Sequence, residues 1–157
     1  MSMARRLLTL VSALVVIVVV AFAGLGWWSH RDGQPVVGLV DGQLARCGPA
    51  PNCVCSEAGG AEAHGVAPLA TSGVEWDRVA GVIRELGGRV VRQDAHYLHA
   101  TFTSRLLRFV DDLELRPDGA VLQVRSASRV GHSDLGVNRQ RVEGLRSALA
   151  AISATRQ

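Results

Sequence analysis

Residues 109–127 read FVDDLELRPDGAVLQVRSA, and this stretch decides the fold. Apolar and polar side chains alternate along residues 109–115 and again along residues 120–127, a pattern typical of half-buried β-strands. The RPDG sequence at residues 116–119 separates the two runs. Proline sets the backbone angle of a turn, aspartate caps it, and glycine tolerates positive φ angles. The stretch therefore predicts an antiparallel β-hairpin.

Two further strands and two helices flank this hairpin in the sequence. Residues 89–94 and 97–103 carry the two-residue period of strands, whereas residues 74–86 and 138–152 repeat apolar side chains at helical intervals. Connections between the strands are short, which makes neighbouring strands antiparallel. The pattern predicts an α+β fold with a two-layer domain, in which a four-stranded antiparallel meander carries two helices packed on one face.

The two faces of this sheet are expected to differ, because alternate residues of a strand point to opposite sides. The apolar face is expected to pack on the helices and to bury Leu98, Phe102, Phe109, Leu113, Leu115, Leu122 and Val124 against Trp76, Ile83, Leu86, Leu145 and Leu149. The opposite face is expected to be open and polar, with His99, Thr101, Asp112, Glu114, Gln123 and Arg125. On that face Asp112 is expected to pair across strands with an arginine such as Arg125.

A long apolar run precedes the domain in this chain of 157 residues. Residues 7–28, LLTLVSALVVIVVVAFAGLGWW, hold no charged side chain and suffice for a helix to cross a hydrocarbon core about 30 Å thick. Arg5 and Arg6 precede the run, while Arg31 is neutralised by Asp32, so the positive-inside bias places the N-terminus in the cytoplasm. We expect a single-pass protein of the cell inner membrane that contacts the lipid bilayer through residues 7–28. The C-terminal domain would then lie in the periplasm or an equivalent extracytoplasmic space.

A signal peptide cleaved at Ala23 is the competing interpretation, because the AFA sequence ending there resembles a small-residue cleavage site. The apolar run is longer than the usual 7 to about 15 residues of such peptides, which favours an uncleaved anchor. On this interpretation residues 1–30 form the cytoplasmic N-terminus and transmembrane anchor. Residues 31–73 form a loop-rich collar with the cysteines, and residues 74–157 form the α+β core of the extracytoplasmic domain.

All seventeen basic residues of the chain are arginines. The absence of lysine excludes chemistry that needs an ε-amine, such as Schiff-base formation or a P-loop lysine on a phosphate. Outside residues 1–30, fifteen arginines face fourteen acidic residues, so the domain has a net charge of only +1. A nearly neutral domain with few aromatic side chains lacks the basic patch of nucleic-acid-binding proteins, and we expect no nucleic-acid partner.

Three motifs in the domain resemble one family. They are CGPAPNCV at residues 47–54, YLHATFTSR at residues 97–105 with FVDD at residues 109–112, and RSASRVGHSDLGVNR at residues 125–139. Together they are similar to the domain of unknown function 1499 family, over roughly residues 40–150. The resemblance implies a small bacterial or plastid protein, often attached to membranes, in a family with no established biochemical activity.

The three cysteines lie close together at Cys47, Cys53 and Cys55. In an oxidising compartment two of them are expected to form a disulfide. The resemblance implies the pair Cys47 and Cys53, since in the family pattern a Ser-Ser pair follows these two cysteines and Cys55 replaces its first serine. A metal site completed by His64 fits no standard ligand spacing, so we expect no metal and no cofactor. Thiol redox chemistry at Cys55 is a further alternative.

Residues 125–141 are the most suggestive segment for function, because Arg125, Arg129, Arg139 and Arg141, together with serines, surround a loop that opens into the last helix. A helix N-terminus beside guanidinium groups suits a carboxylate or a phosphate. The candidate anion-binding or partner-binding residues are His99, Arg125, Ser126, Ser128, Arg129, Asp134, Asn138 and Arg139. The alternative is that these residues bind no ligand and only stabilise the fold. Asn138 or Ser133 then caps the helix, and the arginines pair with acidic residues of the sheet.

These observations favour a membrane-anchored extracytoplasmic protein that acts as a non-catalytic binding or scaffolding module of the cell envelope. Its partner would be an envelope protein or a small anionic ligand. No catalytic residue is assigned, because the chain has no G-x-S-x-G nucleophile elbow. One alternative is a small-molecule hydrolase or lyase that uses His99 with Arg125 or Asp112. A second alternative is a thiol redox protein that acts through Cys55.

Overall fold

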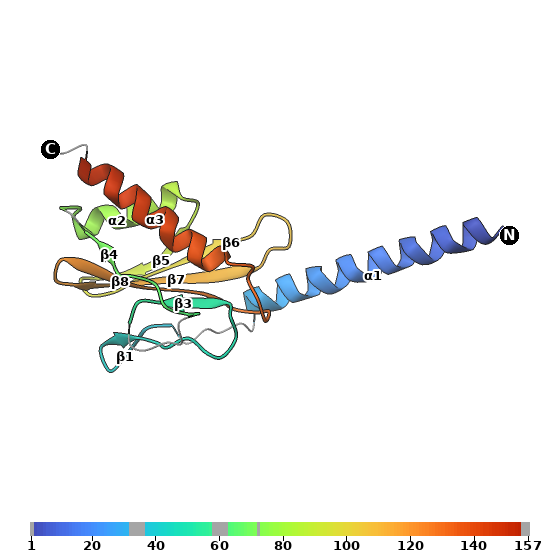
Figure 1. The fold of residues 1–157 in the computed structure, drawn as a ribbon, viewed down its shortest axis with the longest axis horizontal. Coiled ribbons are helices and arrows are strands. Elements are labelled where there is room, and N and C mark those ends of the chain that lie inside the picture. Colours follow the sequence, from blue (N-terminus) through green and yellow to red (C-terminus); the bar gives the residue numbers. More distant parts are fainter. Residues whose placement is uncertain (1, 32–36, 58–62, 72, 155–157) are drawn as a thin grey trace.

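A computed structural model describes residues 2–31, 37–57, 63–71 and 73–154, which form an N-terminal helix and an α+β domain (Figure 1). Helix α1 (Met3–Arg31) projects away from the domain. Helices α2 (Trp76–Glu85) and α3 (Val137–Ala154) lie on the same side of an antiparallel sheet. The α+β fold class and the apolar N-terminal helix expected from the sequence are confirmed.

Within the residues that the structure describes, the central sheet has six strands instead of the predicted four. They are β3 (Cys53–Cys55), β4 (Leu69–Ala70), β5 (Arg89–Gln93), β6 (Leu98–Thr103), β7 (Val110–Asp118) and β8 (Val121–Ser128). Strands β5 to β8 pair in sequence order, each antiparallel to the next, and β3 and β4 both pair with the outer edge of β8. The two additional strands come from the segment interpreted as a loop-rich collar. Strands of two or three residues are too short to show a period in the sequence.

The β7–β8 hairpin is longer than predicted. Strand β7 continues through Pro117 and Asp118, so the turn consists of Gly119 and Ala120 instead of residues 116–119. Gly119 has a φ angle of +60°, which glycine adopts without a steric penalty. The sequence placed the turn too early because proline is common in turns, whereas here it pairs with Leu122 inside the ladder.

The two helices cover one face of the sheet and form the main core with it. From the helices, the buried side chains include Val79 and Ile83 of α2 and Leu145 and Leu149 of α3. The strands contribute Leu98, Ala100, Leu113, Leu115, Leu122 and Val124. Leu86, which we expected in this core, is 42% exposed, because it forms the C-cap of α2 and lies beyond its last turn.

The opposite face of the sheet is covered, not open as the sequence predicted. Residues 37–52 pass beneath it and contain the two-stranded hairpin β1 (Leu39–Val40) and β2 (Gln43–Leu44) (Figure 1). Leu44 packs there with Tyr97 and Cys55 in a second apolar cluster. We call residues 37–52 the cover. The sequence did not reveal it because the cover has no sustained apolar period.

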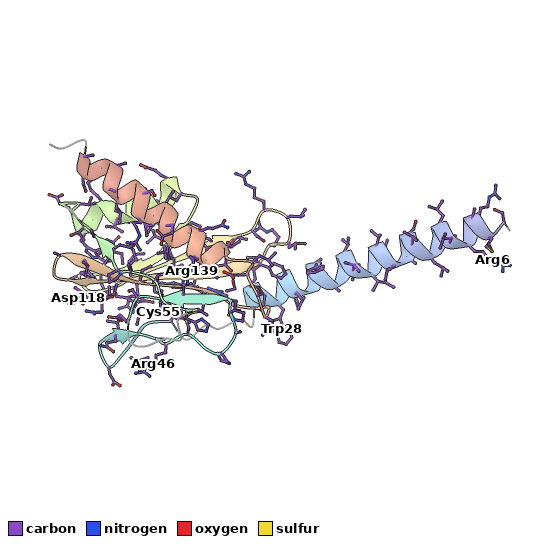
Figure 2. The ribbon with its side chains drawn as sticks, viewed as in Figure 1. Arg6, Trp28, Arg46, Cys55, Asp118 and Arg139 are labelled. Atoms are coloured by element: carbon purple, nitrogen blue, oxygen red, sulfur yellow. A yellow bond between two sulfur atoms is a disulfide. The ribbon has the colours of Figure 1, made fainter. Side chains whose placement is uncertain are left out.

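Helix α1 contacts the domain only near its C-terminal end (Figure 2). The Phe22 ring packs edge-to-face against Phe109, with the ring centroids 6.5 Å apart. Phe109, which we expected in the main core, is not part of that cluster and packs on α1 instead. The Val110 backbone N–H donates a hydrogen bond of 3.0 Å to Ser29 Oγ. Within the described residues, Met3–His30 is the one helix long and apolar enough to cross a membrane.

Gly88, between α2 and β5, provides a test of this packing. A β-carbon at Gly88 would lie 2.6 Å from Ile83 Cγ2 and 2.7 Å from Phe102 Cζ. We expect Gly88→Ala to lower the free energy of unfolding by about 1–3 kcal/mol, because extra atoms in a packed core force strain. Gly81→Ala is the matched control, since nothing lies within 4 Å of its β-carbon position. Alanine inside α2 should instead raise stability by about 0.5–1 kcal/mol.

Urea unfolding of the full chain in detergent, followed by near-ultraviolet circular dichroism, measures both variants. Equal effects of the two substitutions would contradict the packing described for Gly88.

Candidate functional site

Strand register places charged side chains of three neighbouring strands side by side under the cover. His99 of β6 lies opposite Glu114 of β7, which in turn lies opposite Arg125 of β8. Asp112 lies two residues before Glu114 on β7 and points to the same face, because alternate residues of a strand share a face. We call the resulting set the charged layer; its members are Tyr97, His99, Asp112, Glu114, Arg125 and Arg129.

Asp112 is fully buried and is held by two side chains. Arg129 donates two hydrogen bonds of 2.8 Å, from Nε to Oδ2 and from Nη2 to Oδ1, and His99 Nε2 lies 2.7 Å from Oδ1. Burial by itself would raise the pKa of Asp112, but the hydrogen bonds from Arg129 and His99 outweigh it and hold that pKa below its usual value. The Asp112 carboxylate therefore stays ionised inside the protein.

Glu114 is also fully buried and accepts three hydrogen bonds. Tyr97 Oη and the Gly38 N–H donate to its Oε1 at 2.6 and 2.8 Å, and Arg125 Nη1 donates to its Oε2 at 2.5 Å. Burial, followed by the contact with Glu114, raises the pKa of Tyr97, so the phenol remains a donor. The Arg125 Nε atom is buried and has no hydrogen-bond partner in the described part of the chain.

A third carboxylate, Glu57, attaches the cover to the sheet. It accepts hydrogen bonds from the Leu44 N–H and from both Nε and Nη2 of Arg116, the Nε bond measuring 2.8 Å. Together with the bond from Gly38 to Glu114, this contact fastens the cover at two points. Sequence reasoning missed both Glu57 and Arg116, because Glu57 lies in an aperiodic segment and nothing in the pattern shows what it faces.

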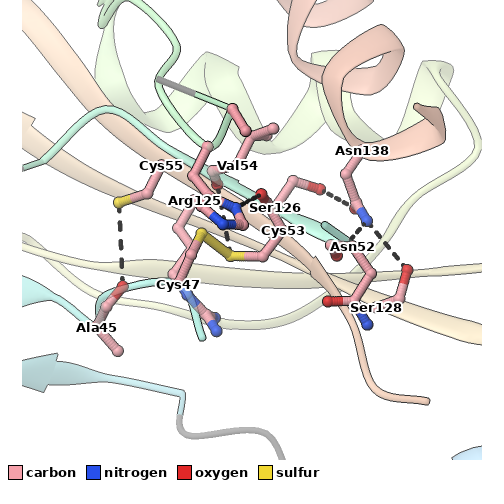
Figure 3. Close-up of a disulfide and its surroundings, with 12 residues drawn as sticks. Ala45, Cys47, Asn52, Cys53, Val54, Cys55, Arg125, Ser126, Ser128 and Asn138 are labelled. Carbon is pink, nitrogen blue, oxygen red and sulfur yellow. Dashed lines mark hydrogen bonds between the residues drawn. A yellow bond between two sulfur atoms is a disulfide. The ribbon is translucent and has the colours of Figure 1, made fainter. Parts of the chain in front are cut away.

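The disulfide between Cys47 and Cys53 is present, in agreement with the expectation from the family resemblance (Figure 3). It links the cover to strand β3. Cys55 is free and buried, with its Sγ 4.0 Å from the Ala45 carbonyl oxygen. Burial raises the pKa of the Cys55 thiol, which disfavours the reactive thiolate. His64 Nδ1 lies 2.9 Å from the Cys53 carbonyl oxygen, and the residues that the structure describes include no group of three metal-ligating side chains.

The serine and asparagine members of the predicted site lie on the other face of the sheet, beneath the start of α3. Ser126 Oγ donates to Asn138 Oδ1 at 2.6 Å. Asn138 Nδ2 donates to Ser128 Oγ at 3.0 Å and to the Asn52 carbonyl oxygen at 2.9 Å (Figure 3). These hydrogen bonds join α3 to strand β8 and to Asn52, the residue just before β3.

Asp134 satisfies free N–H groups at the start of α3. Its carboxylate accepts hydrogen bonds from the Gly136 N–H at 3.0 Å and the Asn138 N–H at 2.7 Å. The capping side chain is therefore Asp134, whereas the sequence suggested Asn138 or Ser133. Arg139, in the first turn of the helix, donates to the backbone carbonyls of Ala63 and Gly65.

The structure thus separates the predicted site residues into two groups on opposite faces of the sheet. His99, Arg125 and Arg129 belong to the charged layer, whereas Ser126, Ser128 and Asn138 lie under α3. Each predicted arginine has a partner within the chain: Arg125 pairs with Glu114, Arg129 pairs with Asp112, and Arg139 binds backbone carbonyls. The expected pair of Asp112 with Arg125 is not formed, because the register places Arg125 opposite Glu114.

A hollow of about 350 Å³ lies between α1 and residues 130–137, the loop that leads into α3. Phe22 and Leu25 line it on the helix side, and His132 and Asp134 line it on the loop side. Near the hollow, the side chain of Leu135 is 90% exposed, and its φ angle of +54° is uncommon for leucine. The hydrogen bonds of Asp134 hold this loop in place, so an apolar tip is presented in a fixed conformation beside the anchor.

A family model described as "Protein of unknown function (DUF1499)" matches residues 43–149. The chain belongs to this family. No curated protein and no solved structure gives a significant match to the chain. The charged layer, the disulfide and residues 130–137 all lie within the DUF1499 match, whereas α1 precedes it.

Within this DUF1499 domain the charged layer is buried and paired within the chain. His99 is 7% exposed, and the carboxylates of Asp112 and Glu114 are fully buried. Each of the two carboxylates accepts three hydrogen bonds from donors of the same chain. The geometry therefore favours an ionic framework that holds the cover on the sheet.

Asp112→Asn tests this framework, because the substitution leaves the Arg129 guanidinium without its counterion. We expect the free energy of unfolding to fall by about 3 kcal/mol at pH 7, as for other broken buried ion pairs. Since the pKa of folded Asp112 is lowered, its stabilisation is present above about pH 4 and is lost as pH falls through the folded-state value. Asp112→Asn should therefore remove that part of the acid-induced loss of stability.

Urea unfolding of the full chain between pH 7 and pH 2 measures this effect. Asp77→Asn, at an exposed position in the first turn of α2, is the control, with an expected change below about 1 kcal/mol. An Asp112→Asn protein as stable as the wild type at pH 7 would contradict the framework.

Proposed function

We propose that this chain is a membrane-anchored, non-catalytic binding module that holds an envelope protein beside the bilayer. In this proposal α1 spans the inner membrane with its N-terminus in the cytoplasm. The DUF1499 domain lies in the periplasm or an equivalent extracytoplasmic space. Arg5 and Arg6, which lie in α1 just before its apolar run, support this orientation.

The anchor is proposed to remain attached, since residues on both sides of Ala23 contact the domain. Phe22 packs on Phe109, and Ser29 accepts a hydrogen bond from Val110. A cleaved chain beginning after Ala23 would lose the Phe22 contact. The same contacts hold the domain close to the end of the apolar run, where a partner at the membrane surface can be reached.

The exposed tip of residues 130–137 is the observation that carries the binding proposal. Leu135 is almost fully exposed although the surrounding loop is fixed by hydrogen bonds to Asp134 and Ser133. An ordered apolar side chain loses little conformational freedom when a partner covers it, which favours binding. The adjoining hollow between this loop and α1 offers space for a partner's side chains.

The other functions considered from the sequence receive less support from the geometry. A hydrolase or lyase using His99 would need this side chain to become accessible, since His99 is 7% exposed and contacts the fully buried Asp112. Thiol chemistry at Cys55 is disfavoured by its burial and its raised pKa. Binding of a small anion is disfavoured because Arg125, Arg129 and Arg139 already have partners.

Site-specific photocross-linking tests the proposal in cells that express the full chain. A photoreactive amino acid at Leu135 is expected to give an adduct of discrete mass. The same group at Ala120, exposed in the β7–β8 turn next to Asp118 and far from α1, should give none (Figure 2). Identical results at the two positions would contradict the proposal.

The protein identified in the adduct is then purified and titrated with the full chain in nanodiscs. Leu135→Asp should raise the Kd at least about tenfold, or about 1.4 kcal/mol, whereas Ala120→Asp should leave it unchanged. A parallel thermal-shift series with inorganic phosphate tests the anion alternative. A rise in Tm that Arg139→Gln abolishes would favour a small anion over a protein partner.

A further inference from the structure

The β6–β7 loop, SRLLRF at residues 104–109, lies directly against the C-terminal end of α1. A β-carbon added to Gly26 would lie 2.0 Å from the Leu107 carbonyl oxygen, so the loop backbone touches the helix backbone there. Phe22 and Ser29 contact the residues that follow, Phe109 and Val110. Because Phe22, Gly26 and Ser29 are spaced by four and three residues, the loop runs along one side of α1.

These contacts fix how deep the loop lies relative to the apolar run. Trp28 ends the run, and tryptophan side chains prefer the membrane interface. Phe22 lies six residues earlier, which is about 9 Å along the helix axis at 1.5 Å per residue. With α1 across a bilayer, as the proposed function requires, the loop extends below the level of Trp28 towards the acyl chains.

The composition and exposure of the loop suit this depth. Leu106 is 88% exposed, and Leu107 is partly exposed beside it. Leaving such apolar surface in water costs roughly 25 cal/mol per Å², a cost that lipid contact removes. Arg105 and Arg108, both exposed, flank the two leucines. Arginine side chains near a membrane surface extend their charged ends to the headgroup level, where lipid phosphates lie.

A cavity of about 590 Å³ between the loop and α1 also indicates a lipid environment. Val18, Phe22 and Ala23 line it on the helix side, and Leu106 and Leu107 line it on the loop side. These residues of α1 belong to the apolar run, so the cavity faces lipid tails when the helix spans a membrane. His30 and Arg108 supply its polar edge.

We propose that the β6–β7 loop is inserted into the leaflet nearest the domain. Leu106 and Leu107 contact lipid acyl chains, Arg105 and Arg108 contact lipid phosphates, and an acyl chain fills the cavity beside α1. The domain is then held to the bilayer at two places, the helix and the loop. Two attachments fix the tilt of the domain and hence the direction in which residues 130–137 point.

Spin labels on the full chain in phosphatidylcholine and phosphatidylglycerol nanodiscs test this inference. Labels are placed at Leu106→Cys, at Ala120→Cys as the aqueous control, and at Val15→Cys in the middle of α1, each in a Cys55→Ala background. Collision rates with oxygen report contact with lipid, and those with a water-soluble nickel chelate report contact with water. We expect the labels at positions 106 and 15 to favour oxygen and the label at position 120 to favour nickel.

The labels distinguish a failure of the loop insertion from a failure of the membrane anchor. A label at position 106 as accessible to nickel as the one at position 120, with position 15 still lipid-exposed, would overturn the loop insertion and leave the anchor intact. An aqueous label at position 15 would overturn the membrane anchor, and with it both proposals.

Two glycines of α1 supply a matched pair of variants that report on the contact itself. Gly26→Ala introduces a β-carbon where the Leu107 carbonyl lies. A β-carbon added at Gly24 would have nothing within 4 Å. With the label at position 106, Gly26→Ala should raise accessibility to nickel, and Gly24→Ala should not. Equal responses to the two substitutions would contradict the docked loop.

Discussion

Two carboxylates, Asp112 and Glu114, are fully buried on the middle strand of the β6–β8 meander, and the rest of the domain is organised around them. A buried charge is costly unless it is paired and hydrogen-bonded. Arg129 and His99 meet this requirement for Asp112, and Arg125 meets it for Glu114. The sheet can therefore bury both of its faces, one under helices and the other under an irregular segment.

The cover is held to the sheet by hydrogen bonds to buried carboxylates and by apolar packing. The N–H of Gly38 binds Glu114 and the N–H of Leu44 binds Glu57, while Leu44 also packs on Tyr97. The Cys47 disulfide adds a covalent link to β3. The two hollows beside α1 lie at the end of the domain that meets the helix. This is why both proposals concern loops at that end.

Sequence periodicity predicted the helices and strands whose apolar side chains recur at regular intervals. It missed the segments that have no such pattern. The helix expected over residues 138–152 is found as Val137–Ala154, and the four longer strands are found within three residues of their expected ends. Strands β3 and β4 and the cover were missed, because segments that are short or held by side-chain hydrogen bonds carry no period. The ion pairs depend on register, which is set by the turn at Gly119. Composition alone showed that acids and arginines balance, but not that Arg125 meets Glu114.

The central claim is that the cover closes over the charged layer, and amide hydrogen exchange at Gly38 and Leu44 tests it most directly. Both N–H groups donate to buried carboxylates. Nuclear magnetic resonance on the full chain in nanodiscs should show both amides exchanging orders of magnitude more slowly than in an unstructured peptide, because exchange requires local opening. Exchange of both amides at unstructured-peptide rates would mean that the cover is open and the charged layer accessible, and would contradict the account.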